Sequence, residues 1–161
     1  TSTHPYRYAQ KARILLPLLR FKRENSEKIK ECLKDSFEKT IISVETQYIN
    51  IKGTISYASI LRELGKFYLE DNTNADYNKS ANYSEKAKVI YEKMDNSNRY
   101  YYYTLRNLAK AYIGLYSKTN ENAYILEALK LFNQIQKYAG SDLGSLKKEA
   151  QNNIDYCIKL L

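Results

Sequence analysis

Apolar residues recur every three or four positions along most of the chain, which is the spacing of one face of an α-helix. The clearest stripe predicts a helix that begins near residue 26 and ends at Gly53; its members are Ile29, Leu33, Phe37, Ile41, Val44 and Tyr48. Residues 6–23 show the same spacing, but Pro17 interrupts them. Because proline removes a helical hydrogen bond, we expect a bend there or two shorter helices.

Clusters of polar turn residues at 71–74, 95–98 and 118–122 divide the rest of the chain. Between and beyond these clusters we predict helices over about 56–70, 77–94, 101–116, 123–140 and 142–161. Short loops cannot carry the chain across a domain, so successive helices should be antiparallel neighbours. The pattern therefore predicts an all-α fold of about seven helices, arranged as a row of antiparallel hairpins.

The composition agrees with a packed helical domain. Of the 161 residues, 43% are hydrophobic and 27% are charged, which is ordinary for a globular protein and fits one domain over 1–161. Two prolines and five glycines are too few for the many turns of a β-sandwich or barrel. The chain has 17 tyrosines and no tryptophan. We expect the tyrosine rings to fill seams between helices while their hydroxyls reach water.

Two stretches of the chain can be laid over each other. The first reads Leu61-x-x-Leu64-Gly65-x-x-Tyr68 followed by Ala87-x-x-Ile90, and the second reads Leu105-x-x-Leu108-Ala109-x-x-Tyr112 followed by Ala128-x-x-x-Phe132. The small residues at 65 and 109 allow the next helix to pack closely. This order of large and small residues resembles the tetratricopeptide repeat (TPR), in which two helices form each repeat. Ser84 departs from the pattern, since an aromatic residue is expected there.

The resemblance implies a short right-handed α-solenoid with a concave groove that holds extended peptides. It divides the chain into a divergent N-terminal hairpin (1–53), two repeats (56–97 and 99–140) and a capping helix (142–161). In this family, fixed offsets from the Leu-Gly pair point into the groove. The same offsets here select Arg62, Lys66, Arg106, Lys110, Lys147 and Gln151, with Tyr103 and Asn107 beside Arg106. Because equivalent positions line up in a stacked solenoid, these residues predict a basic ladder for an acidic peptide.

The charge and the scarcity of catalytic motifs narrow the function. A net charge of +8 and an isoelectric point near 9.3 favour an anionic partner of any kind. The only histidine is His4, and neither a glycine-rich phosphate loop nor a nucleophile motif is present. We therefore expect a protein- or peptide-binding module, not an enzyme, with no metal and no cofactor. It would act as an adaptor or as the sensor part of a larger signalling or defence protein.

Two alternatives remain open at this stage. A nucleic-acid-binding helical-repeat protein would use the basic residues on phosphates and tyrosines on bases, and an intracellular peptide-receptor domain would belong to a regulator. No apolar run is long enough for a membrane span, and Cys32 and Cys157 lack disulfide or metal spacing, which favours the cytoplasm. The chain begins at Thr1 without Met, so we expect a piece of a longer protein. The sequence leaves the oligomeric state open.

Overall fold

The computed structural model describes residues 26–46, 52–70, 75–94 and 98–161. These ranges hold six α-helices and no strand, which confirms the all-α prediction. The helices are α2 (Ser26–Thr46), α3 (Ile55–Glu70), α4 (Tyr77–Glu92), α5 (Arg99–Thr119), α6 (Asn122–Tyr138) and α7 (Gly144–Leu160), with a short 3-10 helix, η2 (Ser141–Leu143), before α7. The helix predicted over 6–23 lies outside the described residues.

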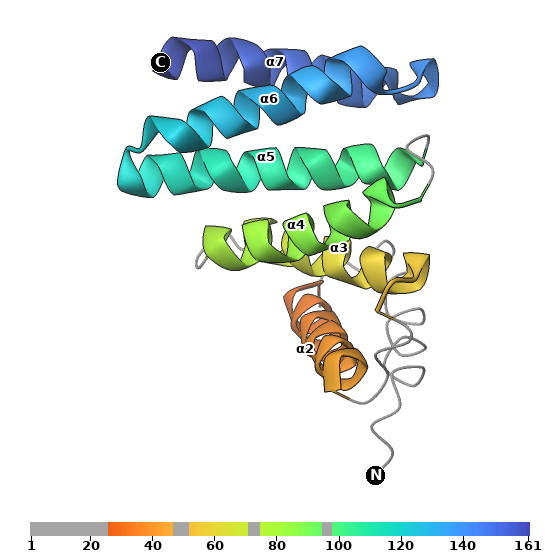
Figure 1. Cartoon of the computed structure of the whole chain (residues 1–161). Helices are drawn as coiled ribbons and strands as arrows, with labels where there is room; N and C mark the ends of the chain where they lie inside the picture. The colour runs from red at the N-terminus through yellow and green to blue at the C-terminus, as the bar shows by residue number, and fades with distance from the viewer. Residues whose placement is uncertain (1–25, 47–51, 71–74, 95–97) are drawn as a thin grey trace.

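The helices pack in the order in which they occur along the chain. From α3 to α7 each helix contacts the next, and α2 contacts α3. Helices two places apart also contact each other, α3 with α5 and α5 with α7. Figure 1 shows the chain running back and forth through α5, α6 and α7, with α2 crossing below α3 at a steep angle. The predicted antiparallel neighbours are therefore present from α5 to α7.

Polar residues mark the start of α4 and both ends of α5. The carboxylate of Asp76 accepts the backbone N–H of Lys79, and the side-chain oxygen of Asn98 accepts that of Tyr100. Both are N-caps that satisfy a donor left free by the first helical turn. Asn120 ends α5 in the left-handed region, at φ 60°, which Asn tolerates better than most residues. These caps make α5 longer at both ends than the predicted 101–116.

The residues of the repeated pattern form the core. Leu61, Leu64 and Leu105 are completely buried, as are Ala87, Ala109, Ala128 and Phe132. Burying an aliphatic or aromatic side chain of this size contributes about 1.5–3 kcal/mol relative to exposing it. The seams between successive helices therefore hold the fold together.

The closest approach of α3 to α4 occurs at Gly65. Its carbonyl oxygen accepts a hydrogen bond from the buried hydroxyl of Ser80 at 2.7 Å. A Cβ at position 65 would lie 2.4 Å from Oγ of Ser84, so a side chain there would clash. The close approach also explains why Ser84 departs from the repeat pattern, because an aromatic ring at 84 has no room. The hydroxyl of Ser84 is buried and has no hydrogen-bond partner among the described residues.

Several tyrosine hydroxyls are bound inside the protein, and the expectation that they reach water is wrong for these residues. Tyr57 donates to Oε1 of Glu45 at 3.1 Å, and Tyr68 donates to Glu38, so both bridge α3 to α2. Tyr102 donates to the carbonyl oxygen of Tyr138 at 2.9 Å. A buried hydroxyl is costly without a partner, and each of these rings is almost fully buried. The tyrosines thus connect neighbouring helices as well as filling space.

Candidate binding face on helices α3, α5 and α7

The predicted ladder residues lie on three helices, of which the middle one, α5, contacts both α3 and α7. Arg62 and Lys66 belong to α3, Lys147 belongs to α7, and the remaining members lie on α5; these are Tyr103, Arg106, Asn107 and Lys110. Because α3 packs on α5 and α5 packs on α7, the three helices can share one face. We call the seven residues the ladder.

Arg106 is held in place by its neighbours on α5. Its Nε and Nη2 donate to Oδ1 of Asn107 at 3.3 and 3.1 Å, and its guanidinium lies over the ring of Tyr103 with Cζ 5.2 Å from the centroid. Asn107 is only 2% exposed, so its amide supports Arg106 and does not reach solvent. The Arg106 side chain itself is 21% exposed. The guanidinium is therefore held in one orientation by contacts within α5.

A carboxylate from α7 lies between Arg106 and Lys110 of α5. Oε2 of Glu149 is 3.6 Å from Nη1 of Arg106, and its Oε1 is in closer contact with Nζ of Lys110. The Glu149 side chain is 31% exposed, so water reaches the cluster and weakens each ion pair. The arrangement is chemically a site in which two cations hold one carboxylate.

Glu149 was missed by the sequence reasoning, although the repeat register contains its signal. The residue before the small position is Leu64 in α3 and Leu108 in α5, and both are buried. In α7 the same position, before Ala150, is Glu149. A carboxylate at a register position that otherwise holds leucine indicates a polar contact there.

The other cations of the ladder also have contacts within the chain. Arg62 pairs with Glu63, and its Cζ lies 4.4 Å from the centroid of the Tyr100 ring on α5. Nζ of Lys66 is 4.0 Å from Oε1 of Glu70, and Nζ of Lys147 donates to the carbonyl oxygen of Ala139 at 3.2 Å. Five cations of the ladder therefore face three carboxylates, which leaves a net charge of +2 on this face.

Neither a metal site nor a membrane-spanning helix is found in the part of the chain that the structure describes. No group of His, Cys, Asp and Glu side chains in these ranges is placed to hold a metal ion. None of the helices there is both long and apolar enough to cross a membrane. Cys32 and Cys157 are free thiols, and burial raises the pKa of Cys157. The thiolate is the reactive form, so this shift makes Cys157 less reactive.

Comparisons with known proteins give no family, since no protein-family model matches the chain and neither a curated protein nor a solved structure matches it.

Proposed function

We propose that the chain is a TPR-like, right-handed α-solenoid that binds an acidic segment of a protein partner and catalyses no reaction. The order of helix packing supports this proposal, because contacts between α3 and α5 and between α5 and α7 are those expected of the inner layer of stacked hairpins. The ladder residues would line that layer. The module would serve as an adaptor or as the sensor part of a larger signalling or defence protein.

The carboxylate of Glu149 between Arg106 and Lys110 is the observation that carries the proposal. It shows that these two side chains can hold a carboxylate together. An Asp or Glu side chain of a partner, placed on the same face, would meet the same donors. Because Asn107 and Tyr103 already orient the guanidinium, less conformational entropy is lost when a partner binds.

In this scheme Glu149 competes with the partner. Its carboxylate must turn away, or share the cations, before a second carboxylate can bind. Ion pairs between partly exposed side chains are worth about 0–1 kcal/mol, so the competition is weak enough for a partner to overcome. The competition still lowers the affinity for segments that carry few carboxylates. A segment must therefore be strongly acidic to bind.

The experiment compares binding of a fluorescein-labelled oligo-glutamate peptide by fluorescence anisotropy for the wild type and two variants. Glu149→Gln removes the competing charge and should tighten binding by about two- to fivefold. Arg106→Gln combined with Lys110→Gln should weaken binding by about tenfold or more. Glutamine is preferred to glutamate here, because a new carboxylate at 106 would face Glu149 and disturb the fold.

The matched control is Lys130→Gln combined with Lys159→Gln, which removes two positive charges from exposed positions of α6 and α7. It should change affinity by less than about twofold, since long-range charge alone is largely screened at physiological salt. Equal weakening by both double variants would contradict the proposal, as would preferential binding of an oligonucleotide of the same charge. Circular dichroism of every variant checks that the helices are intact.

A further inference from the structure

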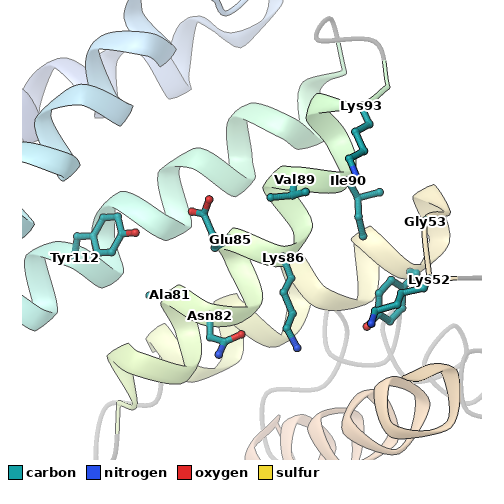
Figure 2. Close-up of a pocket in the computed structure, with 11 residues that line it drawn as sticks. Lys52, Gly53, Ala81, Asn82, Glu85, Lys86, Val89, Ile90, Lys93 and Tyr112 are labelled. Carbon is teal, nitrogen blue, oxygen red and sulfur yellow. The ribbon is translucent and has the colours of Figure 1, made fainter. Parts of the chain in front are cut away.

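A hollow lies along α4. It has a volume of about 770 Å³ and is lined mostly by α4, with Lys52 and Gly53 at one end and Tyr112 of α5 at the other (Figure 2). A volume of this size is typical of sites that hold a small molecule or a few side chains of a peptide. None of the ladder residues lines it. We call this hollow the α4 groove.

The floor of the α4 groove has an ordered pattern. Asn82, Lys86, Val89 and Lys93 are all exposed and follow one another at intervals of four, three and four residues, so they share one face of α4. The stripe extends for about 16 Å at 1.5 Å per residue. Val89 is 41% exposed, and Ile90 lies beside it in the lining. An apolar patch between two lysines is therefore open to solvent.

The charge of the α4 groove is predominantly positive. Three lysines line it, Lys52, Lys86 and Lys93, and Lys93 has no ion-pair partner within the described ranges. Glu85 is the carboxylate of the lining, and it is paired with Lys88 at 3.2 Å. Figure 2 shows Glu85 directed toward Tyr112, while Lys86 points the other way, toward α2.

Lys86 reaches Oε1 of Glu45 on α2 at 3.1 Å, and Tyr57 donates to the same oxygen. Burial alone would raise the pKa of Glu45, but the hydrogen bonds from Lys86 and Tyr57, together with the positive charges of Lys86 and Lys52, outweigh it and lower the pKa. Glu45 is therefore ionised at neutral pH and partly neutralises Lys86. Lys52 acts on Glu45 only through longer-range attraction, and neither Lys52 nor Lys93 makes an ion pair within the described ranges, so these two cations are the best placed to meet an external charge.

We infer that the α4 groove is a second docking site, for an acidic segment of a protein partner that carries an apolar side chain next to its carboxylates. The apolar side chain would cover Val89 and Ile90, and the carboxylates would approach Lys52 and Lys93. Charge complementarity selects the acidic segment, and the apolar floor selects a peptide over a nucleic acid. Tyr57 is buried and one face of the Tyr112 ring is covered by Tyr124, so the groove offers at most one aromatic face to a base.

The test measures binding of two labelled peptides, one of alternating Glu and Leu and one in which Ser replaces Leu. The Glu/Leu peptide should bind the wild type about tenfold more tightly than the Glu/Ser peptide. Lys52→Gln combined with Lys93→Gln should weaken the Glu/Leu peptide by about tenfold, and Val89→Ser should weaken it about threefold without affecting the Glu/Ser peptide. These positions are exposed, so the fold should be unchanged.

The matched control is Lys130→Gln combined with Lys159→Gln, which changes the net charge by the same amount on α6 and α7 and should alter binding less than twofold. NMR chemical shifts locate the bound peptide, and the shifts should fall on α4 and Tyr112. Shifts confined to α3, α5 and α7 would overturn the inference while leaving the ladder proposal standing. Equal loss in both double variants, or tighter binding to anionic vesicles or to an oligonucleotide than to the Glu/Leu peptide, would also overturn it. The ladder variants of Arg106 and Lys110 separate the two proposals, since they should not displace the Glu/Leu peptide from α4.

Discussion

Where α3 and α4 cross at Gly65, the same Ser→Ala substitution at two positions of α4 should change the stability of the protein in opposite directions. Ser80 and Ser84 lie one turn apart on α4, and both are completely buried. The hydroxyl of Ser80 donates to the carbonyl oxygen of Gly65, whereas the hydroxyl of Ser84 has no partner among the described residues. Ser84→Ala should therefore stabilise the protein, and Ser80→Ala should destabilise it.

The magnitudes follow from the contacts. An unpaired buried hydroxyl costs about 1–3 kcal/mol, and the packing lost with one oxygen atom offsets up to about 1 kcal/mol of that. Ser84→Ala should thus raise the free energy of unfolding by about 1 kcal/mol. Ser80→Ala loses a hydrogen bond and leaves the Gly65 carbonyl without that donor, so it should lower the free energy of unfolding by about 1–2 kcal/mol.

Gly65→Ala completes a double-mutant cycle with Ser84→Ala. Alanine favours the helix by about 1 kcal/mol over glycine, but its Cβ would lie 2.4 Å from Oγ of Ser84, and such overpacking costs about 1–3 kcal/mol. Once the oxygen at 84 is removed, the nearest remaining atoms are the Ser80 carbonyl oxygen at 3.3 Å and the backbone nitrogen of residue 84 at 3.4 Å. Gly65→Ala should therefore be less harmful in the Ser84→Ala background, with a coupling of about 1–2 kcal/mol.

Urea unfolding followed by circular dichroism measures all of these free energies, provided the transitions are two-state. Two results would refute the reasoning. If Gly65→Ala had the same effect in both backgrounds, α3 and α4 would not cross at this point. If Ser84→Ala destabilised the protein as much as Ser80→Ala, the hydroxyl of Ser84 would have a partner.

Three further predictions concern other parts of the fold. Burial and then the adjacent Glu92 carboxylate raise the pKa of Tyr101 to about 12 from an ordinary value of 10, so the folded state holds this proton more tightly than the unfolded state does. The contribution of Tyr101 to stability is therefore full below pH 10 and is lost as the pH rises to about 12. Alkaline titration of tyrosine absorbance, followed alongside circular dichroism, should show this loss, and Tyr101→Phe should reduce it. Gly114→Ala would place a Cβ 2.4 Å from Cδ1 of Tyr77 and should cost about 1–3 kcal/mol in urea unfolding, with relief from a smaller residue at 77. Asn98→Ala removes the N-cap of α5 and should lower the melting temperature, at a cost of about 1 kcal/mol, whereas Asn98→Asp should not.

The sequence predicted the helices well because their apolar stripes are regular and their ends carry polar caps. The turn cluster at 95–98 ends with Asn98, and the structure uses this residue to start α5. The extension of α5 to Thr119 was not predicted, because it depends on Asn120 adopting a left-handed conformation. Single-residue conformations of this kind leave no periodic signal in a sequence.

The packing at Gly65 was predicted only in part. The small residue indicated a close approach, and Ser84 stood out as a departure from the repeat, but nothing in the sequence linked the two. They proved to be one feature, since Ser84 lies where the missing side chain of Gly65 leaves room. The tyrosine hydroxyls are a similar case, because the partners of Tyr57 and Tyr68 lie on α2, which shows no match to the repeat.

The candidate site shows where register counting fails. Fixed offsets placed Arg106 and Lys110 on the same face of one helix, and they do share a contact. The offsets describe each helix alone, however, whereas Glu149 lies on α7, two helices after α5. The position of a cation can thus be predicted from its own repeat, whereas its ion-pair partner depends on how helices two places apart are packed.

The net charge of the whole chain differs from the local charge at the ladder. The whole chain carries +8, but the ladder and the three carboxylates paired with it, Glu63, Glu70 and Glu149, have a net charge of only +2. A general positive field attracts any anion and fades within about 8–10 Å at ordinary salt, so affinity for an anion does not by itself identify a site. Only variants of equal charge at different positions separate a local contact from the overall field. For the same reason, the increase in affinity expected for Glu149→Gln must exceed that of Glu127→Gln, an exposed carboxylate on α6 whose removal changes the net charge by the same amount.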